Sequence, residues 1–242
     1  MIRTSNSREH TNREYELELR RLREQLLLMG AKVEEIINGS IRALIDRDSD
    51  LAERMIAVDR KINQLEIAID ELCMQVLARR QPVASDLRFL TTALKLVTDL
   101  ERIGDLGVNI CERVLELNAE PQLKPYVDIP HMGREAQSML REVLDAFVAK
   151  DAERARKVID RDEVVDALYA QVFRELLTFM MESAHNVYRA TRLQSIAKYL
   201  ERMADHTTNL AEMVIFMVDG QDVRHLTSRE DPTAPNPRRE HN

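Results

Sequence analysis

The sequence predicts an all-α protein built from two tandem, pseudo-symmetric antiparallel three-helix bundles. Three observations lead to this fold class. Only 6 of the 242 residues are Gly and 7 are Pro, too few for the many tight turns of a β-sandwich or barrel. Apolar residues recur every three or four positions through long segments, which is the period of a helix. The second half of the chain also repeats the first.

The first half contains three helical segments behind a polar start. Residues 1–12 are polar and are expected to be a flexible N-terminus. The predicted helices run from Glu14 to about Ile45, from Asp48 towards Pro82, and from Asp86 to about Leu117. Asp48 is expected to be the N-cap of the second helix. The first bundle therefore covers residues 13–118.

A proline-rich connector separates the two halves. Pro121, Pro125 and Pro130 fall within ten residues, and so many prolines do not fit inside one helix. Residues 119–130 are therefore predicted to join the bundles without helical structure.

The second half restarts the same scheme. Its predicted helices cover about 131–149, 152–180 and 186–219. Gly220 is suited to end the last helix, because glycine readily takes the left-handed backbone conformation found there. The second bundle is therefore placed at 131–220, and the tail 221–242 is expected to be disordered.

The two halves of the repeat can be matched residue by residue. Met29-Gly30 is matched by Met132-Gly133, 103 positions later, and Asp59 is matched by Asp162 at the same offset. Three residues are then lost, and the third helices align at an offset of 100. Each copy holds three helices, and the two bundles can lie end to end or side by side.

Composition and charge exclude several functions. A net charge of -7 disfavours nucleic acid, and the scattered glycines form no phosphate-binding loop. No segment approaches 18 uncharged apolar residues, and the start of the chain has no signal peptide, so a cytoplasmic protein is expected. Cys73 and Cys111 lie in apolar segments and are predicted to be buried structural thiols.

Repeated carboxylates are the best candidates for a binding site. Glu101, Asp105 and Asn109 are spaced i, i+4, i+8 and share one helix face. The second copy repeats this pattern with Glu201, Asp205 and Asn209, and the middle helices align Asp59 and Asn63 with Asp162 and Asp166. Glu66 and Asp70 continue the stripe in the first half only. Carboxylate and amide oxygens are the ligands of hard cations, so a metal site is predicted, with a duplicated structural role as the alternative.

The same segments resemble a known family. Residues 101–105 (ERIGD) with Asn109, and residues 199–212 (YLERMADHTTNLAE), resemble the paired signature of the PhoU family. Residues 79–88 (RRQPVASDLR) resemble the family's segment between the second and third helices. The likeness covers roughly residues 20–219.

The resemblance implies a metal-binding regulator. PhoU-like proteins are two symmetric three-helix bundles that bind metal clusters through E(D)xxxD motifs. On this chain the motif residues are Glu101 with Asp105, Glu201 with Asp205, and Asp162 with Asp166. The first copy departs from the motif where Asn63 replaces the second carboxylate. The expected cofactors are divalent or trivalent ions, with iron, manganese, magnesium and zinc as candidates.

The resemblance also implies partners. It predicts a negative regulator of the phosphate-starvation response that links the ATPase subunit of a phosphate ABC transporter to a sensor histidine kinase. A homodimer is expected, with membrane contact only through partners and no enzymatic activity. Asp86-Leu87-Arg88 has no counterpart in the second copy, and of two roles, helix capping by Asp86 and partner contact, capping is favoured.

Two other functions remain as alternatives. A metal-free helical adaptor would use the same fold without cations. A ferritin-like di-iron oxidase needs two Glu-x-x-His motifs inside a bundle, and only Glu182 with His185 has that spacing, near a predicted turn. His206 is expected to be a surface or packing residue rather than a ligand.

Overall fold

The computed structural model describes residues 5–221 and 223, with side chains described from residue 13 onward. All regular structure in this part of the chain is helical, which confirms the predicted fold class. The elements are α1 (Ser5–Asp46), α2 (Ser49–Arg79), α3 (Ala84–Asn118), α4 (Asp128–Ala149), α5 (Ala152–Ile159), α6 (Asp162–Glu182), the short 3₁₀ helix η1 (Ala184–Asn186) and α7 (Val187–Asp219). None of these helices is both long enough and apolar enough to cross a bilayer.

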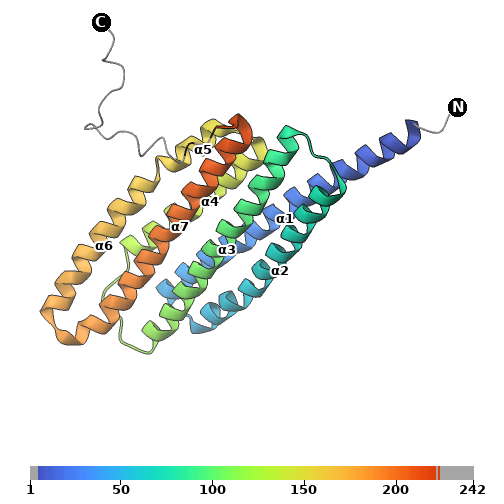
Figure 1. Cartoon of the computed structure of the whole chain (residues 1–242). Helices are drawn as coiled ribbons and strands as arrows, with labels where there is room; N and C mark the ends of the chain where they lie inside the picture. The colour runs from blue at the N-terminus through green and yellow to red at the C-terminus, as the bar shows by residue number, and fades with distance from the viewer. Residues whose placement is uncertain (1–4, 222, 224–242) are drawn as a thin grey trace, which may run out of the picture.

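The helices form two layers that run along one common direction. In Figure 1, α2, α3, α7 and α6 lie side by side across the view, and α1 and α4 lie behind them. The first turns of α1 project beyond the end of the bundle. The two halves are therefore arranged side by side, which resolves the alternative that the sequence leaves open.

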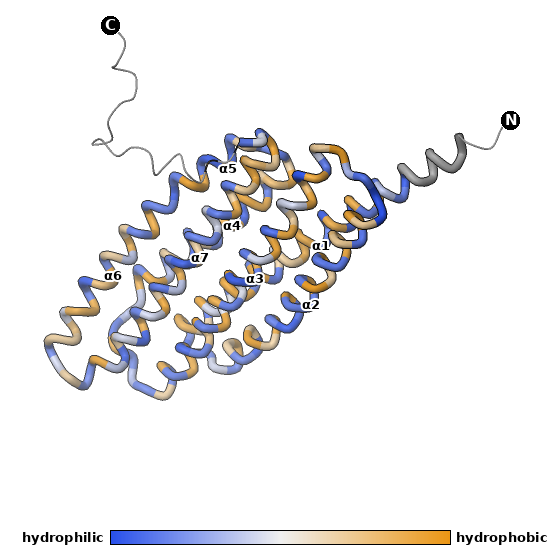
Figure 2. The backbone as a smooth tube through the Cα atoms, viewed as in Figure 1, coloured by the Kyte–Doolittle hydropathy of each residue, from blue (hydrophilic) through white to orange (hydrophobic). Residues whose placement is uncertain are grey.

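One continuous core joins the halves. Apolar residues recur along every helix, as the coloured tube in Figure 2 shows, and the buried ones form a single cluster that draws on α1 to α7. The most extensive helix pair is α3 with α7, one from each half. Burial of this seam removes apolar surface of both halves from water together.

Glycines allow close helix approach at the second seam, between α1 and α4. A Cβ at Gly30 of α1 would lie 2.5 Å from Leu144 Cδ1 of α4, and a Cβ at Gly133 of α4 would lie 2.7 Å from Ile41 Cγ1 of α1. Each contact maps onto the other at the offset of 103. The repeat is therefore expressed in space as a pseudo-two-fold axis between the halves.

The predicted helix ends at Asp48 and Gly220 are confirmed. Asp48 Oδ1 accepts a hydrogen bond of 2.8 Å from the Leu51 N–H at the start of α2. Its repeat mate Asp151 caps α5 in the same way, through the Arg154 N–H at 2.9 Å. Gly220 has φ 72° and donates its N–H to the Phe216 carbonyl at 2.9 Å.

The backbone is helical from Ser5, whereas the sequence predicts a flexible N-terminus over residues 1–12, of which 1–4 lie outside the described part of the chain. One predicted boundary is wrong. The predicted connector includes Pro130, yet α4 begins at Asp128 and Pro130 is its third residue. The first-turn N–H groups of a helix have no acceptor within the helix, so a proline there loses no hydrogen bond. Residues 224–242 of the predicted tail lie outside the described part of the chain.

The sequence predicts a continuous middle helix in the second half, but in the structure this helix breaks into α5 and α6. Asp160 and Arg161 lie at the break, where the first half has Ala57 and Val58 within an unbroken α2. Val58 is partly buried against the core, whereas Arg161 pairs with Glu135 of α4 at 2.6 Å. At the break, the charged side chain of Arg161, paired with α4, takes the place of the apolar contact that Val58 makes in the first half.

Asp86 does not cap α3. This helix begins at Ala84 behind Val83, and no side chain accepts a hydrogen bond at that end. Asp86 instead accepts a 2.9 Å hydrogen bond from the hydroxyl of Tyr15 on α1. The two cysteines are buried and free, as predicted, and burial raises the pKa of each thiol to about 12.

Candidate metal-binding clusters

The structure brings the acidic faces of α2 and α3 together. Glycine and alanine at equivalent places, Gly104 and Ala204, lie within the motif and keep the third helices close to the middle ones. A Cβ at Gly104 would lie 3.0 Å from Ile62 Cδ1 and 4.0 Å from Asp59 Oδ1. We define the first carboxylate cluster as Asp59, Asn63, Glu66 and Asp70 of α2 with Glu101 and Asp105 of α3.

Charges in the first cluster repel each other in a partly desolvated setting. Burial, and then the charge of Asp105, raise the pKa of Asp59 above its ordinary value. Burial and neighbouring carboxylates also raise the pKa of Glu66 and of Glu101, while Arg102 opposes both shifts. Burial raises the pKa of Asp70. A cation placed here would relieve this repulsion.

Two oxygens of the first cluster lack hydrogen-bond partners. Asn63 Nδ2 donates to Asp59 Oδ2 at 3.0 Å, which leaves Asp59 Oδ1 and Asn63 Oδ1 buried and unpaired. Buried polar atoms without a partner are costly and uncommon. Both atoms are lone-pair donors of the kind that hard cations bind.

The second carboxylate cluster lies at the equivalent place in the other half. It consists of Asp162 and Asp166 of α6 with Glu201 and Asp205 of α7. Burial, followed by the charges of Asp205, Asp166 and Glu201, raises the pKa of Asp162 to about 6. Burial and the charge of Glu201 raise the pKa of Asp205 as well. Glu201 Oε2 is buried without a hydrogen-bond partner.

The two clusters differ in charge. Lys198 pairs with Glu201 at 2.6 Å and lies over the ring of Tyr169, and its counterpart in the first half is Thr98. Tyr169 and Phe173 stand where the first half has Glu66 and Asp70. The first cluster therefore carries more negative charge, and in the second a lysine already compensates part of it. The sequence pattern misses Lys198 because the motif aligns carboxylates only.

Asn109 and Asn209 lie one turn beyond the motif on α3 and α7, and Asn209 is exposed. Within the described part of the chain, no group of three or more carboxylate, histidine or cysteine side chains is gathered closely enough to hold a metal ion as it stands.

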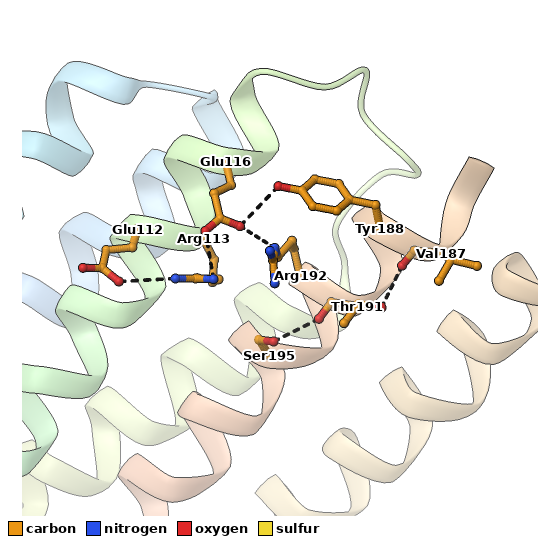
Figure 3. Close-up of polar contacts among 8 residues, drawn as sticks. All are labelled: Glu112, Arg113, Glu116, Val187, Tyr188, Thr191, Arg192 and Ser195. Carbon is orange, nitrogen blue, oxygen red and sulfur yellow. Dashed lines mark hydrogen bonds and ion pairs between the residues drawn. The ribbon is translucent and has the colours of Figure 1, made fainter. Parts of the chain in front are cut away.

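Polar contacts across the α3–α7 seam are not predicted by the sequence pattern. His206 Nδ1 lies 2.8 Å from Asp99 Oδ1, so this histidine joins the halves. At the far end of the same seam, Glu116 of α3 contacts Arg192 and the hydroxyl of Tyr188 on α7, as Figure 3 shows. No sequence signal reveals these pairs, because they depend on how the halves pack.

The oxidase motif does not lie inside a bundle. Glu182 is the last residue of α6 and His185 belongs to η1, and both side chains are exposed. A di-iron site of the ferritin type needs such residues facing inward between helices.

Comparison with known proteins explains the repeat. The model of the PhoU domain matches residues 26–114 and again 129–214, one match in each half. The chain belongs to the PhoU family. The phosphate-specific transport system accessory protein PhoU homolog of Pseudomonas aeruginosa is 42% identical over 227 residues, 93% of this chain and 94% of that one. The PhoU protein of Escherichia coli is 36% identical over 225 residues, 93% of each chain.

Solved PhoU structures share the fold. The crystal structure of PhoU from Pseudomonas aeruginosa matches with a TM-score of 0.83 at 43% identity, covering 86% of this chain and 100% of that one. The phosphate transport system regulatory protein PhoU from Streptococcus pneumoniae matches with a TM-score of 0.79 at 31% identity, covering 86% of this chain and 99% of that one.

The raised pKa of Asp162 makes stability depend on pH. Its folded-state pKa of about 6 exceeds the ordinary 3.8, so its ionisation costs stability as pH rises through 6. We expect Asp162→Asn to raise the free energy of unfolding of the metal-free protein by about 1 kcal/mol at pH 7.5, after allowance for solvent screening. The gain should shrink towards pH 4, where the wild-type carboxyl is protonated. Urea unfolding at both pH values checks this, with the exposed Glu163→Gln as the control that changes neither.

Proposed function

We propose that this protein is a metal-binding regulator of phosphate-specific transport that acts as an adaptor rather than as an enzyme. Its relatives are named accessory and regulatory proteins of phosphate transport systems. The observation that carries the metal-binding part is the recurrence of a strained carboxylate cluster at equivalent places in both halves. A purely structural role would not require like charges to face each other in both halves.

The donor atoms of the two clusters are of the kind that hard cations bind. In the first cluster Asp59, Glu101 and Asp105 would supply carboxylates. In the second, Asp162, Asp166, Glu201 and Asp205 would do so, and Asn109 and Asn209 are proposed as amide ligands one turn away. The raised pKa values and the unpaired oxygens of Asp59, Asn63 and Glu201 support this assignment. Iron, manganese, magnesium or zinc would neutralise the negative charge there.

The family and the shape support an adaptor role. We propose that the protein connects the ATPase subunit of a phosphate ABC transporter with a sensor histidine kinase and represses the phosphate-starvation response, working in the cytoplasm as a homodimer. Long rigid helices with a continuous core present extended surfaces to two partners at once. Cations bound at the two clusters would change the charge of those surfaces, which sets electrostatic complementarity.

Metal analysis and binding assays test both parts. The protein is purified without added metal, and bound metals are measured for the wild type and for a variant with Glu101→Gln, Asp105→Asn, Glu201→Gln and Asp205→Asn. We expect the variant to lose most of the bound metal. Glu163→Gln, which changes an exposed carboxylate beside the second cluster, should keep it.

The same preparations are then used in pull-downs with the purified transporter ATPase and the kinase. Binding of both by the wild type supports the adaptor role, and binding of neither removes it. A wild type without metal that still binds both partners would favour the metal-free adaptor. Turnover that depends on oxygen or peroxide would favour the di-iron oxidase.

A further inference from the structure

A groove with a cavity volume of about 350 Å³ lies on the surface between α1 and α4. Its floor is apolar and buried, formed by Ile37 and Ile41 of α1 and by Pro130 of α4. Gly133 also lines it, and the absence of a side chain there lets Ile41 of α1 pack directly against α4. The volume lies at the lower end of the range that small-molecule sites occupy.

The polar lining of the groove carries only positive charge. Arg42 of α1 and Arg134 of α4 are exposed at its edge, together with the amides of Asn38 and Gln137. The lining contains no carboxylate, although the chain has 42 Asp and Glu residues. Neither arginine makes an ion pair with any residue whose side chain is described. Two unpaired guanidinium groups beside neutral amides and an apolar floor suit an anion with an apolar body.

The pseudo-two-fold axis supplies an internal comparison. The counterparts of Asn38 and Gln137 at the offset of 103 are Arg141 and Glu34. Arg141 Nη2 pairs with Glu34 Oε2 at 2.9 Å, so an ion pair crosses the equivalent place. The counterpart of Arg42 is Asp145, which pairs with Arg154 at 2.7 Å. On one side of the pseudo-two-fold axis the charges satisfy each other, and on the other side the two arginines are left for a ligand.

We propose that this groove binds a small phosphate monoester with a flat apolar body, of the nucleoside monophosphate class. Arg42 and Arg134 would hold the phosphate from the two helices, because the planar guanidinium pairs well with phosphate oxygens. The body would lie over this floor and against the exposed side chain of Ile45, which also lines the groove, and would remove apolar surface of Ile45 from water. Asn38 and Gln137 can each donate and accept hydrogen bonds at the edge of a base or to the ribose hydroxyls. Neither carboxylate cluster contributes to this site.

Titration calorimetry with adenosine monophosphate tests the proposal on the full chain. A ligand of this size is expected to bind with a dissociation constant on the order of 10–100 µM. Arg42→Gln and Arg134→Gln should each weaken binding about tenfold or more, since each removes a charge-assisted hydrogen bond. Both side chains are exposed, so the variants should keep the wild-type helical circular dichroism.

Two further variants use the internal comparison. Asn38→Arg combined with Gln137→Glu copies the Arg141–Glu34 pair into the groove and should abolish binding. Arg141→Gln, on the other side of the pseudo-two-fold axis, should leave it unchanged. The proposal is overturned if adenosine monophosphate does not bind at millimolar concentration, or if the two arginine variants bind as the wild type does. It is equally overturned if inorganic phosphate binds as tightly as the ester, or if only anionic lipid vesicles bind.

Discussion

Gly107→Ala is expected to lower the free energy of unfolding by about 2 kcal/mol, because the new methyl group has no room. A Cβ at Gly107 of α3 would lie 2.3 Å from Ile36 Cγ2 of α1 and 3.4 Å from Ile36 Cβ. Ile36 is fully buried, and its branch at Cβ cannot turn away without leaving its preferred rotamer. The gain of about 1 kcal/mol that alanine brings to a helix interior does not offset this overlap. Urea unfolding of the metal-free protein measures the change.

A matched glycine and a second-site change test the cause. Gly30→Ala places its methyl group near Leu144 Cδ1, the far end of a flexible side chain, so its effect should be close to zero. Ile36→Leu moves the branch away from Cβ and should restore part of the stability lost in Gly107→Ala. If Gly107→Ala were neutral, or if Ile36→Leu gave no recovery beyond its own effect, the close packing of α1 on α3 would not be the reason for the glycine.

Saturating Mn²⁺ is expected to raise the Tm by about 5–10 °C. A cation at a hundredfold excess over its dissociation constant adds about 2.7 kcal/mol of stability, and each kcal/mol shifts the Tm by about 2–4 °C for a chain of this size. The physical reason is that the folded protein holds like charges together in both clusters, and the cation removes their repulsion. A thermal melt with and without Mn²⁺, and after chelation, measures the shift.

Variants of the clusters distinguish the repulsion between carboxylates from the binding of Mn²⁺ in this experiment. Asp105→Asn combined with Asp205→Asn keeps the side-chain shape but removes one charge from each cluster. The metal-free variant should melt at or above the wild-type temperature, and Mn²⁺ should then raise its Tm far less. Glu163→Gln should respond like the wild type. An equal shift in the double variant would show that Mn²⁺ binds elsewhere, and no shift in the wild type would remove the clusters as Mn²⁺ sites.

Local rules predict those features that depend on neighbouring residues. The helical period locates the long helices, and the short polar side chain of Asp48 and the backbone freedom of Gly220 mark two ends. The i, i+4 spacing also places Glu101 with Asp105 on one face, however that helix packs against its neighbours. Each of these follows from the geometry of a single helix.

Features that depend on packing between helices are not predictable in this way. The break at Asp160 contains neither proline nor glycine, and Arg161 is drawn to Glu135 of a different helix. Asp86 has the chemistry of a cap, but Tyr15 lies close enough to use it. Lys198 lies over the ring of Tyr169 because α7 packs beside α6, whereas its ion pair with Glu201 is an i, i+3 contact within α7.

The pseudo-two-fold seam affects how the sequence of such a chain can diverge during evolution. A single copy of the repeat would expose the faces of its first and third helices, and two identical copies would cover them as an isologous dimer. In an isologous dimer every substitution occurs on both sides of the axis at once. Covalent fusion removes that constraint, so that Asn38 and Gln137 can differ from Arg141 and Glu34 across the same seam. Duplication within one chain has thus allowed one side of a shared interface to diverge while the other keeps its ion pair.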